Sequence, residues 1–318
     1  MVTRAPEQGP DAAALAAAVA ALAGSGRIPL GDLPVEPASL GLASDGTHAW
    51  LPDEITLLDA DTIRAALNGR TRAWLQNLEV HRVIGSTSTL LAERSGRRSI
   101  DGHVCLAEVQ LAGRGRRGRR WLSPLGGNLA VSLGFGSRRP AGELGGLSLV
   151  VGLAVLDALE SLGVAGLGLK WPNDLLLGDA KLAGILIELL QQGPAVSFTV
   201  GIGINVRLPD AARTAVDQPV ADLAGCPSLP DRSRLAAAVI SSVTDFVGEF
   251  QELGFEPFRA AFDARHRLHG EAATVSMTGA EPVSGRVLGV SEGGGIRLAT
   301  DAGDQVFHGG EISLRRAP

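Results

Sequence analysis

The sequence contains few of the residues that build disulfide frameworks or metal centres. Cys105 and Cys226 are its only cysteines in 318 residues, and no Cys-x-x-Cys pair occurs, which excludes a disulfide scaffold and a thiolate metal site. Among the six histidines, His266 and His269 form the one close pair, and no acid accompanies them at the spacing of a metal site. We therefore expect no metal held by protein side chains alone, and a protein of the reducing cytoplasm.

Apolar runs long enough for a membrane are also missing. The alanine-rich stretch 12–23 is too short to cross a bilayer. Glu7 and Asp11 precede it, where a secretory signal carries positive charge. With Asp11 as N-cap and Gly24 at its end, the stretch predicts a short helix. We expect no membrane partner.

Arginine, by contrast, is abundant at one place. Residues 113–120 hold five arginines and three glycines, although the chain carries a net charge of −5. The segment reads Gly-x-Gly-x-x-Gly, but predicted strands at 104–109 and 128–135 flank it, so it does not open a helix as a dinucleotide-binding motif does. Glycine amides and guanidinium groups can grip a carboxylate or a phosphate. The pattern fits a small-anion site, and it also fits a solvated basic loop or a nonspecific nucleic-acid patch.

Three further segments have both a structural and a functional explanation. The hydroxyl run 86–89 predicts a helix cap, and its hydroxyls could also bind a polar ligand. Lys170 ends a short apolar strand, where a lysine is costly unless an anion pairs with it, although lysines at strand ends are common on surfaces. Glycines in the predicted strand 196–206 let a flat ligand approach the backbone, and close strand packing predicts the same glycines. An apolar stripe over 147–162 predicts a core helix.

Smaller units are predicted at both ends of the chain. Residues 40–50 predict a hairpin that turns at Asp45-Gly46. A helix over 61–67 and a strand over 74–83 then lead into the main domain. From residue 271 on, short alternating segments separated by glycines predict a small β-barrel. Length and a 45% hydrophobic content fit two or three domains.

Six motifs, in chain order, resemble those of bacterial biotin protein ligases over most of the chain. They are Gln110, Gly-Arg-Gly-Arg-Arg-Gly-Arg at 113–119, Lys-Trp-Pro-Asn-Asp at 170–174, Lys-Leu-Ala-Gly-Ile-Leu at 181–186, Gly-Ile-Asn at 203–205 and Gly-Gly-Glu-Ile-Ser-Leu-Arg at 309–315. The resemblance implies an α/β (α+β) fold, in which a central mixed sheet with flanking helices is similar to that of class II aminoacyl-tRNA synthetases. It implies an N-terminal winged-helix remnant at 1–63, a catalytic domain at 64–269 and a C-terminal SH3-like barrel at 270–318.

The resemblance also implies a reaction. Such a ligase joins biotin and ATP, with Mg²⁺, into biotinyl-5′-AMP and transfers biotin to a lysine of the biotin carboxyl carrier protein of acetyl-CoA carboxylase. Arg116 and Lys170 are the implied catalytic pair, since fixed cations act where charge builds on the α-phosphate. The implied biotin contacts are Ser86, Thr87, Ser88, Gln110, Gly113, Arg114, Gly115, Arg116, Lys170 and Gly203. The implied contacts to ATP and the adenylate are Arg116, Arg119, Trp121, Asn173, Asp174, Lys181 and Asn205.

Two features depart from the family pattern. The usual Ser-Thr-Asn motif is here Ser86-Thr87-Ser88, so position 88 keeps a hydroxyl but loses two amide donors. Bifunctional members carry a winged helix-turn-helix that represses biotin synthesis genes. Here about a dozen residues separate Gly26 from the hairpin, and 29–50 contains no lysine or arginine. We therefore expect no recognition helix and no DNA binding.

Other functions stay open at this point. A bifunctional ligase and repressor would need the DNA-binding surface that the N-terminus does not predict. A lipoate ligase shares the main-domain fold and would respond to lipoate instead of biotin. An RNA-binding protein would need aromatic platforms near the arginine loop, where only Trp121 lies. The edge of the main sheet offers a contact for a homodimer.

Overall fold

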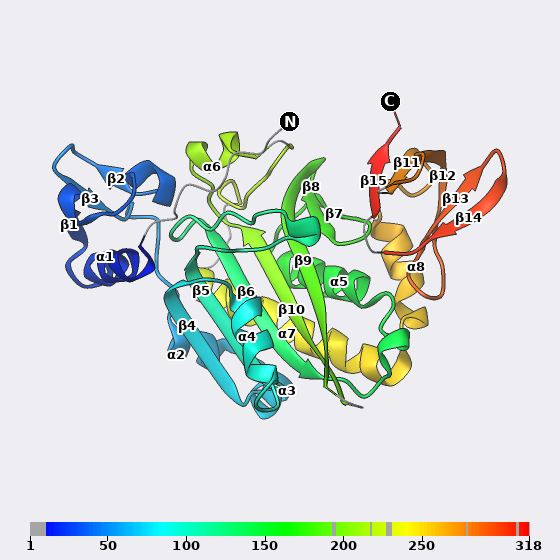
Figure 1. Cartoon of the computed structure of the whole chain (residues 1–318), viewed down its shortest axis with the longest axis horizontal. Helices are drawn as coiled ribbons and strands as arrows, with labels where there is room; N and C mark the ends of the chain where they lie inside the picture. Colours follow the sequence, from blue (N-terminus) through cyan, green and yellow to red (C-terminus); the bar gives the residue numbers. More distant parts are fainter. Residues whose placement is uncertain are drawn as a thin grey trace.

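The protein is described by a computed structural model that covers residues 11–192, 195–216, 218–226, 231–277, 279–309 and 312–317. A seven-stranded mixed sheet forms the centre, with a small N-terminal unit on one side and a β-rich C-terminal unit on the other (Figure 1). Within the described ranges, no helix combines the length and the apolarity needed to cross a membrane. The expected α/β fold with a central mixed sheet is confirmed.

The central sheet brings the sequence motifs together. Its strand order is β4-β5-β6-β10-β9-β8-β7, in which β4 and β5 are parallel and the other neighbours antiparallel. The register places Lys170, Asp174, Gly184 and Gly203 in one row across four neighbouring strands. The strands are β4 (Asn77–Ile84), β5 (His103–Gln110), β6 (Asn128–Gly136), β7 (Leu167–Lys170), β8 (Asp174–Leu177), β9 (Ala180–Gln192) and β10 (Ala195–Asn205).

Helices cover both faces of this sheet. On one face lie α5 (Leu147–Ser161) and α7 (Arg232–Leu253), and on the other lies α4 (Thr87–Ser95) (Figure 1). Most of α5 is buried, because its apolar side chains meet the sheet on one side and α7 on the other. The predicted core helix is therefore confirmed. The shorter helices are α2 (Ala60–Ala66), α3 (Gly69–Trp74), α6 (Asp210–Thr214) and α8 (Glu256–Arg265).

The start of the main domain differs in part from the prediction. The predicted helix at 61–67 is α2, and its N-cap Asp59 accepts a hydrogen bond from the Thr62 amide. Strand β4 begins only at Asn77, because the Asn68 side chain accepts from the Thr71 amide and starts α3 in the segment just before it. The predicted strand at 74–83 therefore begins too early.

The N-terminal unit consists of one helix and a three-stranded sheet of order β1-β3-β2. Asp11 caps the helix as predicted, but the helix ends at Gly26, whose φ of 74° suits glycine, and not at Gly24. The predicted hairpin is β2 and β3, which turn through Gly46 at φ 88°. The elements are α1 (Ala12–Ser25), β1 (Arg27–Pro29), the 3-10 turns η1 (Leu30–Asp32) and η2 (Pro37–Leu40), β2 (Ala43–Ser44) and β3 (His48–Trp50).

The C-terminal unit is a five-stranded antiparallel sheet of order β14-β13-β12-β11-β15. In the described part of the chain, no pairing between β14 and β15 closes it into a barrel. Trp171 ties the unit to the main sheet, since its indole N–H donates to the Gly294 carbonyl at 3.0 Å. The strands are β11 (Ala272–Met277), β12 (Val283–Val290), β13 (Ile296–Thr300), β14 (Gly303–Phe307) and β15 (Ile312–Arg316).

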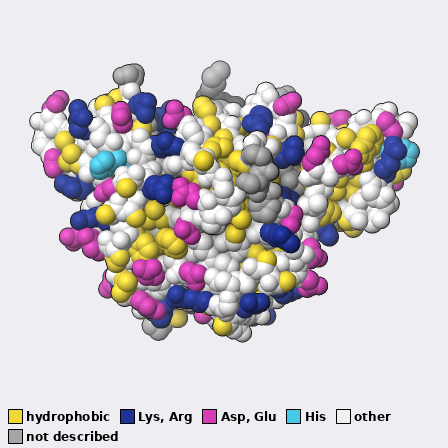
Figure 2. All heavy atoms as spheres, turned by 180° about the vertical axis from the view of Figure 1, so that it is seen from behind, with side chains coloured by type: hydrophobic (Ala, Val, Ile, Leu, Met, Phe, Trp, Pro, Cys, Tyr) yellow, Lys and Arg dark blue, Asp and Glu magenta, His cyan; other side chains and the backbone are white. Residues whose placement is uncertain are grey.

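Charged side chains of both signs are interspersed over the face seen from behind (Figure 2). In the sequence, by contrast, residues 113–120 hold five arginines and no acidic residue. The buried charges are paired: Glu108 on β5 forms an ion pair with Arg232 at the start of α7. Arg232 also donates to the Thr56 carbonyl, so this pair fixes the linker from the N-terminal unit to the core.

Candidate active site

One pocket collects almost every residue that the sequence singled out. Of the sixteen expected ligand-binding residues, all except Gly113 line it. Gly113 lies at the base of the arginine loop, where a Cβ atom would come within 2.6 Å of the Trp121 carbonyl oxygen. The pocket walls come from the start of α4, the segment 110–122, strands β6 to β10, the segment 208–220 and β15.

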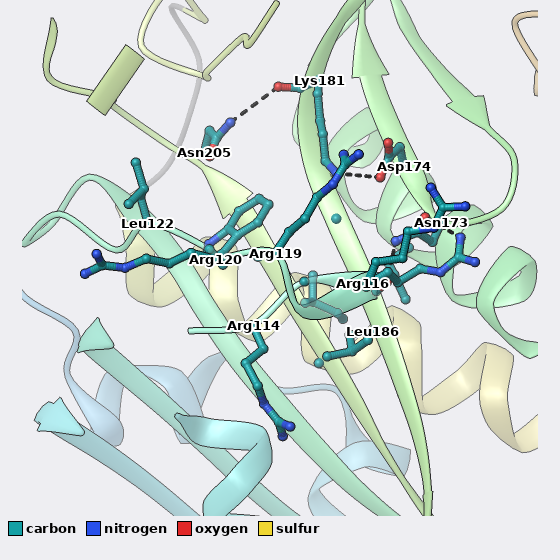
Figure 3. A pocket seen from close by; sticks show the side chains of 18 of the residues that line it. Arg114, Arg116, Arg119, Arg120, Leu122, Asn173, Asp174, Lys181, Leu186 and Asn205 are labelled. Carbon is teal, nitrogen blue, oxygen red and sulfur yellow. Dashed lines mark hydrogen bonds and ion pairs between the residues drawn. The ribbon is translucent and has the colours of Figure 1, made fainter. Parts of the chain in front are cut away.

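The arginine loop is a short hairpin. Arg114 and Arg120 face each other in an antiparallel bridge, and the Gly115 amide donates to the Arg119 carbonyl at 2.8 Å. The tip turns through Arg117 and Gly118, both at positive φ. Two flanking strands and a loop were predicted, and the bridge inside the loop was not. The bridge between Arg114 and Arg120 holds the loop, and with it the guanidinium groups, over the sheet (Figure 3).

The guanidinium groups of this loop point in different directions (Figure 3). Arg116 is half-buried and donates to Asn173 Oδ1 at 3.2 Å. Arg114 extends away from it and binds Glu188 on β9 at 2.9 Å and the Thr89 hydroxyl at 3.1 Å. The Arg116 guanidinium is therefore placed to bind an anion in the pocket. The Arg114 guanidinium is bonded to Glu188 and Thr89, so this residue can contribute its backbone groups to the pocket.

Two lysines lie on the opposite wall, and they are the only lysines in the whole chain. Lys181 Nζ is 2.6 Å from Asp174 Oδ1, as the dashed line in Figure 3 shows. Burial lowers the pKa of the Lys170 ammonium below its usual range, and Arg315 and Lys181 also lower it against an opposing effect of Asp174. Burial and then Arg117 lower the pKa of the Arg116 guanidinium. The pocket thus concentrates cations that an anionic ligand would stabilise.

The flat group against the strand glycines is Trp121. A Cβ atom on Gly203 would come within 2.4 Å of its indole ring, and one on Gly184 within 3.2 Å. Lys181 Nζ lies 5.9 Å from the centre of the same ring, within cation–π range. The indole therefore leaves no room for a side chain at Gly203 and little room at Gly184, a reason for these glycines that neither of the two earlier explanations had included.

The other end of the pocket carries a relay of hydroxyl groups. Gln110 Oε1 accepts from the Thr87 backbone amide at 2.9 Å, which identifies that atom as the amide oxygen. The Thr87 hydroxyl, at 3.1 Å from the same oxygen, must then donate to it. Ser132 therefore donates to Thr87 at 2.8 Å, and Ser88 donates to Ser132 at 2.9 Å. Each hydroxyl uses its proton inside the relay and has only lone pairs left for a ligand.

This relay accounts for the departure at position 88. Ser88 is buried, and a Cβ atom on Gly201 would come within 2.7 Å of its hydroxyl oxygen. The Ser88 hydroxyl packs against the backbone of Gly201 and is the last group of the relay. Ser86 has a structural role, because its hydroxyl accepts from the Thr89 amide at the start of α4, as the cap prediction required.

Asn205 lies between the lysine motif and the segment that follows β10. Its side-chain amide donates to the carbonyls of Lys181 and Ala221. It thereby connects two walls of the pocket. Arg119 and Asn173 also line the pocket on the side of the lysines.

Several pocket residues were not found from the sequence. Ser132 gives one usable signal, because it is the one hydroxyl in the otherwise apolar run 129–135 of β6. Leu208, Ala212 and Val216 give none, because they lie in or beside α6, a helix of five residues that is too short to show periodicity. Arg315 reaches the pocket from β15, whereas Glu311 of the same terminal motif lies outside the described residues.

Metal-binding capacity is limited. Among the described residues, no group of three His, Cys, Asp or Glu side chains could hold an ion, and Asp174 is the one carboxylate that lines the pocket. A single carboxylate still fits Mg²⁺, which in nucleotide sites is bound by one or two carboxylates together with phosphate oxygens and water.

Comparisons with known proteins agree with this geometry. Residues 80–205 match the biotin/lipoate A/B protein ligase family, and residues 269–315 match the biotin protein ligase C terminal domain. A bifunctional ligase/repressor BirA of Escherichia coli is 35% identical over 84% of this chain and 81% of its own. A biotin--[acetyl-CoA-carboxylase] ligase of Mycobacterium tuberculosis is 35% identical over 81% of this chain and 96% of its own.

Solved structures agree as well. The biotin protein ligase from Aquifex aeolicus in complex with biotin and ATP matches with a TM-score of 0.66 and 30% identity, over 76% of this chain and all of its own. Sequence, fold and pocket together show that the chain belongs to the biotin protein ligase family.

Proposed function

We propose that the protein is an ATP-dependent biotin ligase that acts on a biotin carboxyl carrier protein. In the first step the biotin carboxylate oxygen attacks the α-phosphate of ATP, and pyrophosphate leaves. In the second step a carrier lysine attacks the acyl carbon of biotinyl-5′-AMP, AMP leaves and the amine loses a proton. The observation that carries the proposal is one pocket with hydrogen-bond acceptors at one end and clustered cations at the other.

Arg116 and Lys170 stabilise the charge that develops in the first step. Both are partly buried and enter the pocket from different walls. A cation held in place before the reaction lowers the barrier without reorganising in the transition state. In the second step the same pair stabilises the AMP that leaves. Mg²⁺, when bound with the nucleotide, would be held by Asp174 and Asn173 and would neutralise phosphate charge.

The hydroxyl relay favours biotin over lipoate. Because Thr87, Ser88 and Ser132 have used their protons inside the relay, they can only accept hydrogen bonds from a ligand. The cyclic urea of biotin carries two N–H donors, whereas the dithiolane ring of lipoate carries none. A pocket of buried acceptors discriminates strongly against a ligand that leaves them unpaired.

The test is exchange of labelled pyrophosphate into ATP with biotin, with lipoate or with neither. Exchange with biotin alone is the expected result, and exchange with lipoate alone would instead identify a lipoate ligase. Arg116→Ala should lower the exchange rate about 10²- to 10³-fold. Arg234→Ala, which removes an exposed arginine of α7, is the matched control and should leave the rate unchanged. Absence of exchange with either acid would contradict the proposal.

We also propose a homodimer through β9. Strand β8 pairs with β9 only as far as Gly184, and in the part of the chain that the structure describes no further strand pairs with residues 186–190 on that side. Leu189 in this stretch is 49% exposed. Antiparallel pairing of two such edges would extend the sheet. Sedimentation of the protein with biotin and ATP should show a dimer that Leu189→Asp weakens, and a monomer at all concentrations would exclude this contact.

We further propose that the protein acts in the cytoplasm and does not repress transcription. Cys105 and Cys226 are both free, as a reducing compartment allows. Between β1 and β2, where a winged helix places its DNA-reading helix, the N-terminal unit has the short turns η1 and η2. Binding of the protein with biotin and ATP to an operator-like DNA at physiological salt would contradict this view.

A further inference from the structure

A series of buried polar contacts runs from the core of the main domain to the nucleotide end of the pocket, where Trp121 and the cations lie. It starts at the ion pair of Glu108 and Arg232, whose side chains are 0% and 6% exposed. Replacing such a pair by apolar residues of similar size is often neutral or stabilising, because buried charges give up their hydration. Stability alone therefore does not account for these charges, and the hydrogen bonds that they direct are the property that apolar residues would lack.

The Arg232 guanidinium joins several segments of the chain. Besides its bond to Glu108, it donates to the Thr56 carbonyl at 3.1 and 3.2 Å and to the Asn128 carbonyl at 2.8 Å. Asn128 is the first residue of β6 and is fully buried. Because a guanidinium holds its N–H groups in one plane, the bond to Glu108 sets the direction in which Arg232 meets Asn128.

The side chain of Asn128 extends these contacts to the pocket. Its amide nitrogen donates to the Leu122 carbonyl at 2.8 Å. Leu122 and its neighbour Trp121 both line the pocket, and together they form its indole wall. Asn128 is therefore bonded to the core through its backbone and to the indole wall through its side chain.

Two polar atoms beside this contact have no hydrogen-bond partner among the described residues. They are Trp121 Nε1 and Asn128 Oδ1, and both are buried. A buried polar atom without a partner costs free energy, so these two atoms do not hold the indole wall in place. The bond from Asn128 Nδ2 to Leu122, by contrast, ties that wall directly to the central sheet.

Asn128 has a counterpart on the neighbouring strand. It is the register partner of Asn205 on β10, and directly paired residues project to the same face of a sheet. Asn205 binds the carbonyls of Lys181 and Ala221. From one level of the sheet, the two asparagines therefore hold two different walls of the nucleotide end.

We propose that Glu108, Arg232 and Asn128 are positioning residues of the ligase, which hold the Trp121 indole where the nucleotide binds. The proposal rests on the ligase function above. In the part of the chain that the structure describes, the pocket lining includes none of these three residues, so they act on the nucleotide through the indole wall. The pair of Glu108 and Arg232 orients Asn128, and Asn128 orients the wall.

Removal of the Asn128 side chain tests the proposal. In pyrophosphate exchange, Asn128→Ala should raise the KM for ATP about fivefold, the effect of one lost hydrogen bond, and should leave the KM for biotin unchanged. Asn68→Ala is the matched control, because Asn68 caps α3 and does not line the pocket. It should weaken the fold and leave both KM values unchanged. An equal rise in the KM for ATP in both variants would trace the effect to stability and overturn the proposal.

A double-mutant cycle shows whether Asn128 acts through the indole. Trp121→Ala alone should also raise the KM for ATP, and Asn128→Ala should add almost nothing in that background, because the group that it positions is gone. A further increase of about fivefold in the double variant would contradict the proposal. Glu108→Leu together with Arg232→Met replaces the ion pair by apolar side chains and should reproduce the effect of Asn128→Ala. An unchanged KM for ATP would overturn the role of the pair.

Failure of the ligase function would give a different result. Exchange by the unmodified protein with biotin is measured first, and its absence would overturn the proposed function. Calorimetry with α,β-methylene-ATP in the presence of biotin needs no turnover, because the bond that breaks when pyrophosphate leaves is blocked. An affinity about fivefold weaker in Asn128→Ala than in Asn68→Ala would support the positioning role, and equal affinities would overturn it.

Discussion

The two ends of the pocket are built by different means. At the biotin end, Thr87, Gln110 and Ser132 belong to α4, β5 and β6, and their hydrogen bonds determine each other. At the nucleotide end, Lys170 and Lys181 stand on strands, Arg116 and Trp121 come from the loop 110–122, and charge dominates. Recognition of a neutral ring needs directed donors and acceptors on rigid elements, whereas recognition of phosphate tolerates loops because guanidinium and ammonium charges act over longer distances.

Removing a cation should have the largest effect and should affect catalysis more than biotin binding. Lys170→Ala should lower the rate of adenylate formation about 10²- to 10³-fold, because it removes a fixed charge next to the reacting phosphate. The biotin dissociation constant should change much less. Rapid-quench measurement of adenylate and calorimetry of biotin binding check both. An equal loss in the rate of adenylate formation and in biotin affinity would show that the two ends of the pocket do not act independently.

The stability of the protein should fall in acid because of a buried histidine behind Lys170, at the nucleotide end of the pocket. His266 is buried, stacks on Phe262 and bridges to Leu169, the neighbour of Lys170. Burial, together with His269 and Lys170, lowers the pKa of His266 to about 4 from 6.5. The unfolded chain therefore binds the extra proton, and stability that is present above pH 6.5 should fall by about 3 kcal/mol as the pH drops to about 4.

Denaturant unfolding between pH 4 and pH 7 measures this loss. His266→Phe keeps an aromatic ring against Phe262 and should flatten the pH dependence. His308→Phe, at an exposed histidine, is the matched control and should not. An unchanged slope in His266→Phe would assign the acid sensitivity to other groups.

Breaking the relay should have a moderate effect that is confined to biotin. Ser132→Ala removes two linked hydrogen bonds and should raise the KM for biotin about 30-fold, at about 1 kcal/mol for each bond. Ser88→Ala removes only the last bond and should raise it less. Steady-state exchange kinetics with varied biotin and varied ATP separate the two substrates. A comparable increase in the KM for ATP would contradict the division between the two ends.

The smallest expected effect is on pH dependence. Since burial lowers the pKa of Lys170, its charge is lost at a lower pH than that of an ordinary lysine. Adenylate formation should therefore decline on the alkaline side, and Lys170→Arg should move that decline to higher pH, because guanidinium stays charged. A pH–rate profile of both proteins is the measurement. Coincident alkaline limbs would show that another group titrates there.

The sequence predicted the pocket better than its internal organisation. Residues from 86 to 205 could be assigned to one site because motifs at strand ends meet when strands pair, as the row from Lys170 to Gly203 does. The polarity of the relay and the packing of Trp121 on Gly203 could not be predicted. They depend on residues 45 and 82 positions apart, respectively, coming within a few ångströms, and spacing along the chain contains no sign of either.

The C-terminal sheet shows the same limit. Alternation predicted short strands from residue 271 on, whereas the segment that contains most of β15 was identified only by its resemblance to the family motif at 309–315. The pairing of β15 with β11 brings Arg315 to the pocket edge. Register between distant strands decides that placement, and local pattern does not.

The placement of the lysines has a practical consequence. Lys170 and Lys181 are the only side-chain amines in the chain, and both line the pocket, while every other basic side chain that is permanently charged is an arginine. Arginine does not react with activated esters under conditions in which amines do, because it stays protonated. In the purified protein, an amine-directed acylating reagent can therefore mark only the pocket and the amino terminus, and protection by substrate would report the fraction of occupied sites.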